Sequence, residues 1–90
     1  MIFRIDNDTT VIDLDGGLIE VTRPTVGGGI ASHIIDSEYS AFNVAHWLKE
    51  RAARTAPLIQ ERFPNMVKED REFLMTGITP AAWNKMFKSE

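Results

Sequence analysis

The sequence predicts a single α+β domain, in which an N-terminal antiparallel β-meander of three or four strands packs against a long helix and is followed by short C-terminal helices. The first third of the chain is rich in β-branched residues, separated by turn-forming Asp-Asn and Asp-Gly pairs. From residue 36 onward, the apolar residues recur with helical spacing instead. Because 90 residues have room for one core, we expect one domain, with the β-meander over 1–35 and the helical part over 37–90.

The segments "IFRI", "TTVIDL" and "GLIEVTR" are the predicted strands. The pair Asp15-Gly16 favours a two-residue hairpin turn, because such a turn needs positive φ at both central residues and these residue types tolerate it. This turn predicts that Ile12 faces Ile19. The predicted core face of the hairpin then carries Ile12, Leu14, Ile19 and Val21. Whether residues 30–35 form a fourth strand stays open at this point.

The segment "RPTVGGGIASH" is a candidate ligand-binding loop. Consecutive glycines can turn their amide groups toward one point and bind an anion such as a phosphate, and polar side chains nearby can add donors. The candidate ligand-binding residues are Arg23, Thr25, Gly27, Gly28, Gly29 and His33. The following "IASHII" alternates like a strand, whereas a phosphate loop leads into a helix. A flexible connection between two strands is therefore the favoured interpretation.

Residues 37–54 are predicted to form the long helix. Asp36 or Ser37 is the expected N-cap, and arginines near the end complement the helix dipole. A stripe of small and aliphatic residues recurs with helical spacing and should face the sheet. This stripe consists of Ala41, Val44, Ala45, Leu48 and Ala52.

Aromatic side chains lie away from that stripe, where a solvated helix would carry charged residues. The candidate partner-binding residues are Tyr39, Phe42, His46 and Trp47. One interpretation is a second core, formed when the C-terminal helices fold back over this side. The other is a surface that binds a protein partner, because exposed aromatic clusters mark binding sites.

Prolines and a glycine divide the remaining chain into short helices. Pro57 opens the segment "APLIQERF", and Pro64 ends it. The segment "NMVKEDREFLMTG" stops at Gly77 in the manner of a helix C-cap. Thr79 and Pro80 are then the expected cap and first residue of the last helix.

The last two helices have the outline of a helix-turn-helix, which makes DNA binding by residues 69–88 a third hypothesis. The apolar side of the last helix is predicted to carry Trp83, Met86 and Phe87. Its polar side offers lysines but no arginine toward a DNA groove. The formal net charge of −3 further opposes binding to a phosphate backbone. We therefore expect no nucleic-acid partner.

Composition also argues against several other classes of protein. With no cysteine, two histidines and no cluster of metal-ligand spacing, we expect neither an enzyme nor a metal or cofactor site. No stretch approaches the roughly 18 apolar residues that span a bilayer. The N-terminal "MIFRIDNDTT" becomes acidic where a signal peptide would be apolar. A cytoplasmic protein with no membrane partner is the expectation.

The segment "EDREFLMTGITPAAWNKMF", residues 69–87, resembles C-terminal stretches of small, uncharacterised accessory proteins of tailed bacteriophages. The recurring pattern joins "EFL", "TGIT", a proline and a tryptophan, and it covers about a fifth of the chain. The resemblance implies a non-enzymatic protein of the bacterial cytoplasm that binds and modulates or inhibits a host protein. A homodimer is also expected, because a core this small is marginally stable. The alternative is a protein that sequesters a small ligand or nucleotide with residues 23–33.

Overall fold

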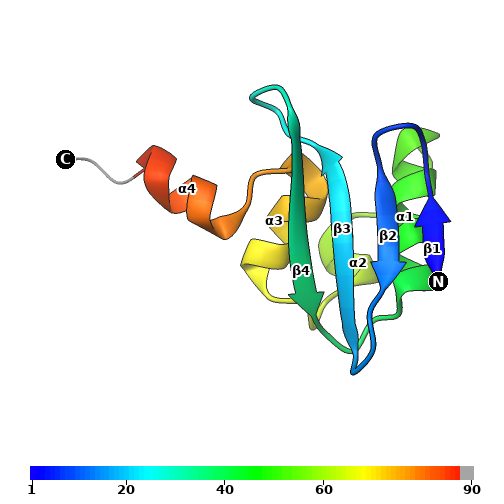
Figure 1. Cartoon of the computed structure of the whole chain (residues 1–90). Coiled ribbons are helices and arrows are strands. Elements are labelled where there is room, and N and C mark those ends of the chain that lie inside the picture. Colours follow the sequence, from blue (N-terminus) through cyan, green and yellow to red (C-terminus); the bar gives the residue numbers. More distant parts are fainter. Residues whose placement is uncertain (88–90) are drawn as a thin grey trace.

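The computed structural model describes residues 1–87, and within them it forms a four-stranded antiparallel sheet in the order β1-β2-β3-β4 (Figure 1). The strands are β1 (Ile2–Arg4), β2 (Thr10–Asp13), β3 (Leu18–Pro24) and β4 (Ile30–Asp36). The helices of this part are α1 (Ala41–Ala52), α2 (Ile59–Arg62), α3 (Lys68–Thr76) and α4 (Pro80–Phe87). The predicted α+β class is confirmed, and the open question of the fourth strand is answered by β4.

The β2–β3 hairpin differs from the prediction by one residue. A two-residue turn predicted that Ile12 faces Ile19, but Ile12 pairs with Glu20. The reason lies in the loop, where both Gly16 and Gly17 have positive φ. The loop therefore holds one residue more than a two-residue turn does, and the register predicted from Asp15-Gly16 is wrong.

This shift turns β2 over relative to the prediction. Because side chains alternate between the two faces of a strand, a slip by one residue exchanges the core set and the outer set. Val11 is fully buried, whereas Ile12 and Leu14, which were predicted in the core, are only partly buried. Ile19 and Val21 on β3 are buried as predicted.

Helix α1 begins later than predicted. Its N-cap is Ser40, whose hydroxyl accepts a hydrogen bond from the backbone N–H of Asn43 at 3.1 Å. The expected caps, Asp36 and Ser37, fail because β4 continues through Asp36 and the Ser37 hydroxyl accepts from the backbone N–H of Tyr39 instead. The sheet-facing stripe is buried as predicted except for Ala52, the last residue of the helix.

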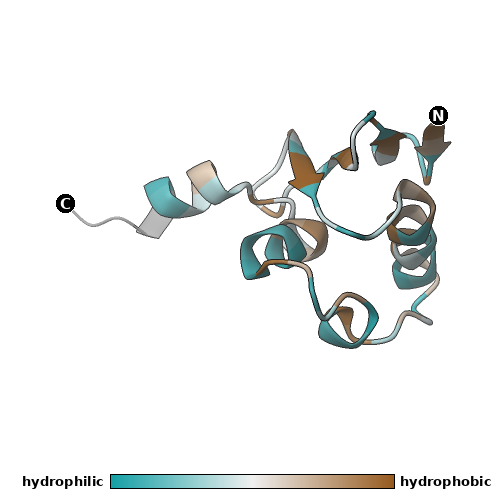
Figure 2. Ribbon diagram, turned by 90° about the horizontal axis from the view of Figure 1, so that it is seen from below, coloured by the Kyte–Doolittle hydropathy of each residue, from teal (hydrophilic) through white to brown (hydrophobic). Residues whose placement is uncertain are grey.

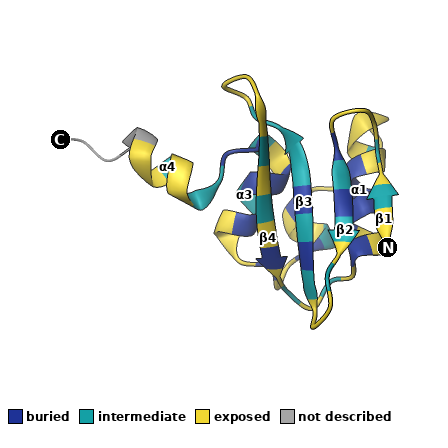
Figure 3. Cartoon of the chain, in the orientation of Figure 1, coloured by how far each residue is buried: buried dark blue, intermediate teal, exposed yellow. Residues whose placement is uncertain are grey.

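The core lies between the sheet and the layer formed by α1, α2 and α3, which cover one face of the sheet (Figure 2). The segment 59–74, which contains α2 and α3, brings a second group of large apolar side chains into this core. This group consists of Ile59, Phe63, Met66, Phe73 and Leu74, all of them buried. The buried positions gather on the inner side of the strands and helices, while α4 is mostly exposed (Figure 3).

Helix α4 projects beyond β4 and away from the body of the molecule (Figure 1). Its N-cap is Thr79 as predicted, since the Thr79 hydroxyl accepts from the backbone N–H of Ala82 at 3.1 Å. Gly77 ends α3 in the left-handed conformation, with φ at 77°. A Cβ at Gly77 would collide with the Pro24 carbonyl oxygen, so the β3–β4 loop can approach only a glycine. The side chains of Met86 and Phe87, expected on the apolar side of α4, lie outside the described part.

Candidate functional site: the groove between β1 and α1

The structure divides the aromatic residues that were grouped together from the sequence. Trp47 is buried, with 2% of its surface exposed, and its indole N–H donates to the Pro57 carbonyl oxygen at 3.1 Å. The hydroxyl of Tyr39 accepts from the backbone N–H of Asn65 at 3.0 Å, and its ring meets Phe63 edge-on at 4.9 Å. Trp47 and Tyr39 therefore belong to the second core that α2 and α3 complete.

Phe42 and His46, by contrast, remain at the surface. Phe42 is 60% exposed, although it lies in the first turn of α1, between the buried Ala41 and Val44. Its ring stacks on His46 with a centroid separation of 6.0 Å. On its other side it meets Phe3 edge-on, with the centroids 6.1 Å apart. Phe42 therefore joins α1 to the first strand, and sequence analysis did not include Phe3 in this site.

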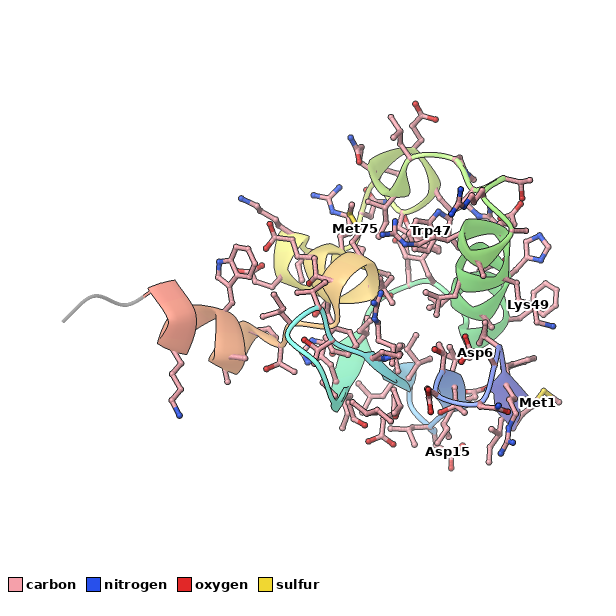
Figure 4. The ribbon with its side chains drawn as sticks, turned by 90° about the horizontal axis from the view of Figure 1, so that it is seen from above. Met1, Asp6, Asp15, Trp47, Lys49 and Met75 are labelled. Carbon is pink, nitrogen blue, oxygen red and sulfur yellow. The ribbon has the colours of Figure 1, made fainter. Side chains whose placement is uncertain are left out.

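These side chains form a shallow groove between the edge of the sheet and the helix, which we call the β1–α1 groove. Its volume is about 240 Å³, and it is lined by Ile2, Phe3, Arg4, Phe42, Ala45, His46 and Lys49. Ile2 is 65% exposed. Lys49 and Met1 lie on the same side of the molecule, beside α1 and β1 (Figure 4). The groove thus combines an apolar floor with a rim that carries only cationic charges.

Glu50 lies beside the groove and contacts two cationic or basic side chains. Glu50 Oε2 lies 3.6 Å from His46 Nε2, one helical turn away. The other carboxylate oxygen of Glu50 accepts from the Arg62 guanidinium at 2.8 Å. The Arg62 guanidinium therefore offsets the negative charge that Glu50 brings next to His46.

A second apolar surface is the outer face of the sheet, which lies opposite α1, α2 and α3 (Figures 1 and 2) and is bordered at Ile34 by the beginning of α4. Cross-strand pairing places one row of side chains across all the strands. This row is Ile2, Ile12, Glu20 and Ile34. Ile34 is half exposed, and Ile30, farther along β4, is more exposed still. We call this surface the open sheet face.

The glycine loop is folded on itself rather than open toward a ligand. The Thr25 N–H donates to the Gly29 carbonyl at 3.1 Å, and the Gly28 N–H donates to the Thr25 carbonyl at 3.0 Å. The Val26 N–H donates to the Thr76 carbonyl of α3 at 3.0 Å. Of the three glycine amides of the candidate anion site, that of Gly28 therefore already has an acceptor within the protein. Gly27, the residue before Gly28, lies exposed.

Arg23 does not point into the glycine loop. Its guanidinium donates to the carbonyl oxygens of Leu74 at 2.6 Å and Pro24 at 2.7 Å. Arg51 donates to the Met75 carbonyl at 3.2 Å, so both arginines complement the C-terminal end of α3. Partial burial, and then the nearby Arg51 charge, lower the pKa of Arg23. Arg23 therefore fastens α3 to the sheet.

His33 likewise makes a contact that sequence analysis missed. Its Nε2 lies 2.7 Å from Asp70 Oδ1, and its ring packs against Phe73 with centroids 5.1 Å apart. His33 therefore joins β4 to α3. It is separated from His46, which lies at the opposite edge of the sheet on the β1 side.

Helices α3 and α4 do not form the compact pair that a helix-turn-helix requires. Helix α4 extends away from α3, and the space between them is an open groove that contains Trp83. Glu69 and Glu72 of α3 line the same groove. Carboxylates in this position would repel the phosphates of DNA.

No protein-family model matches the chain, and neither a curated protein nor a solved structure shows significant similarity to it. Among residues 1–87, no helix has both the length and the apolar character needed to cross a membrane. In the same part of the chain, His, Asp and Glu side chains do not gather in threes as metal ligands would.

Proposed function

We propose that the chain is a small non-enzymatic accessory protein that binds a host protein, and modulates or inhibits it, in the cytoplasm of a bacterium infected by a tailed phage. One observation carries the proposal, namely the exposed Phe42 ring in the β1–α1 groove, next to Phe3 and Ile2. The phage context comes from the resemblance of residues 69–87 and is part of the proposal.

The physical argument concerns the cost of leaving these side chains in water. Single apolar residues at a surface are common, but contiguous ones mark binding sites. Phe42 is an aromatic anchor, and Ile2 beside it is a smaller apolar residue. On binding, the two together remove more apolar surface from water than an isolated apolar residue does. The groove is also built on a helix and a strand of the core, which hold Phe42 in place before a partner arrives.

The two other functions have less support in the contacts of the chain. A phosphate bound by the glycine loop would compete for the Gly28 amide and for the Arg23 guanidinium, and both of these are hydrogen-bonded within the protein. A helix-turn-helix protein binds DNA with a helix that packs closely against the helix before it. Helix α4 instead projects from the body of the molecule, and the carboxylates of α3 lie beside it.

The expected homodimer belongs to the same proposal. The open sheet face is the surface for a second copy, because Ile12 and Ile34 lie there on the side of the sheet opposite to the helix layer. Two such faces packed together would form the familiar sandwich of two aligned sheets. Ile2 belongs to both surfaces, whereas the α1 side of the β1–α1 groove, with Phe42 and Lys49, would stay accessible to a host protein.

Native mass spectrometry of the untagged protein, purified gently from the bacterial cell, tests the proposal. We expect two copies of the chain together with a stoichiometric host protein. Phe42→Ala should lose the host protein, whereas Leu58→Ala, which removes an equally exposed side chain outside the groove, should keep it. A wild-type spectrum without any host protein, or a Phe42→Ala variant that retains it, would overturn the proposal.

A further inference from the structure

We infer that the partner presents an extended segment in which acidic and apolar side chains alternate, and that this segment adds to β1 as a further strand of the sheet. The inference rests on the proposed function, since it names the partner chemistry of the same groove. It follows from three features of the β1–α1 groove, which are the free edge of β1, the direction of the lining side chains and the sign of their charges.

The first feature is the edge of the sheet. Within the described residues, β1 is paired with β2 on one side, and no strand lies on its other side. The unpaired N–H and C=O groups of such an edge are a template for an added strand. At the opposite edge, the beginning of α4 lies beside β4, where Pro80 shares a hollow with Ser32 and Ile34. Of the two edges, β1 is therefore the open one.

The second feature is the direction of the side chains. A strand added to β1 directs alternate side chains toward α1 and toward the outer face of the sheet. Those that point toward α1 meet Phe42 and Ala45, and those that point outward meet Ile2. Because β1 has only 3 residues, main-chain pairing alone is weak, and these apolar contacts must supply much of the affinity. An extended segment with apolar residues at alternate positions satisfies this requirement.

The third feature is charge. The charged residues that line the groove are Arg4 and Lys49, both exposed and both cationic, although the whole chain carries a formal net charge of −3. Arg4 points to the outer side of β1, and Lys49 approaches from α1. Acidic residues in the segment complement both, while a basic segment would meet like charges. Such rim charges act mainly on specificity and on the rate of association.

Selection of short linear peptides from a random display library, with the full chain immobilised at low ionic strength, tests this inference. We expect the enriched peptides to alternate Asp or Glu with apolar residues. The double variant Arg4→Glu/Lys49→Glu should instead enrich Lys and Arg, and it should bind the peptides selected on the wild type at least about tenfold more weakly. An unchanged circular dichroism melting curve would show that this variant is folded.

Hydrogen exchange of the chain bound to the most enriched peptide adds a structural readout. We expect slower exchange in β1, because an added strand takes up its free amide groups. Unchanged exchange in β1, or enriched peptides with no preference for acidic residues, would overturn the inference. If the host protein is nevertheless retained by the wild type and lost by Phe42→Ala, the proposed function stands and only the inference about the partner is wrong.

Discussion

Trp47 and Phe42 are aromatic residues of the same helix, yet their surroundings differ completely. The chain after α1 folds back over Trp47, where Phe63 at the end of α2 packs edge-on against the indole ring and the Pro57 carbonyl before α2 accepts from the indole N–H. Phe42 faces the edge of the sheet, where the chain offers it Phe3 and the His46 ring and leaves most of it in water. An aromatic residue outside the sheet-facing stripe needs a cover. For Trp47 the same chain supplies that cover, and for Phe42 we propose that a partner does.

The largest expected effect is that of Trp47→Ala on stability. Replacing a fully buried Trp removes its packing and leaves a cavity, which costs about 3–5 kcal/mol of the free energy of unfolding. Urea denaturation of the purified variant measures this loss. A change below about 1 kcal/mol would mean that the side chain is not enclosed, and the contrast with Phe42 would disappear.

A pair of arginines extends the comparison to charged side chains. Arg23 is hydrogen-bonded to the Leu74 carbonyl, and Arg4 lies exposed in the groove. Arg23→Ala should lower the free energy of unfolding by about 1.5–3 kcal/mol, because the hydrogen bonds that fasten α3 are lost. Arg4→Ala should change it by less than about 0.5 kcal/mol. Equal losses in the two urea titrations would refute the structural role assigned to Arg23.

Tyr39→Phe gives a smaller effect that refines the assignment of Tyr39 to the second core. The substitution keeps the ring on Phe63 and removes the acceptor of the Asn65 N–H. We expect a loss of about 1 kcal/mol in the free energy of unfolding, with the host protein still bound. Loss of the host protein without any loss of stability would instead place Tyr39 in the binding surface.

The sequence predicted the elements better than the way they face one another. Alternating β-branched residues and turn pairs located the strands, and helical spacing located four of the five stripe residues of α1. The orientation of β2 failed because it depends on whether Gly17 enters the loop, which the Asp-Gly pair does not determine. The start of α1 failed because β4 extends through Asp36.

The candidate sites depended on contacts that have no local signal. His33 and its partner Asp70 lie 37 residues apart, and Arg23 lies 51 residues from Leu74. No pattern around either residue indicates such a partner, so both remained available for a hypothetical ligand site. The aromatic residues of α1 could not be told apart for the same reason, since Trp47 is covered by residues from Pro57 onward that have no local signal around Trp47.

The most direct test of the account is a variant that should change stability little. Phe42→Ala removes a side chain that is mostly in water, so its free energy of unfolding in urea should fall by no more than about 1 kcal/mol. In the native mass spectrum the same variant should lose its host protein. A loss of about 3 kcal/mol or more would place Phe42 in the core beside Trp47 and contradict the claim that its cover comes from a partner.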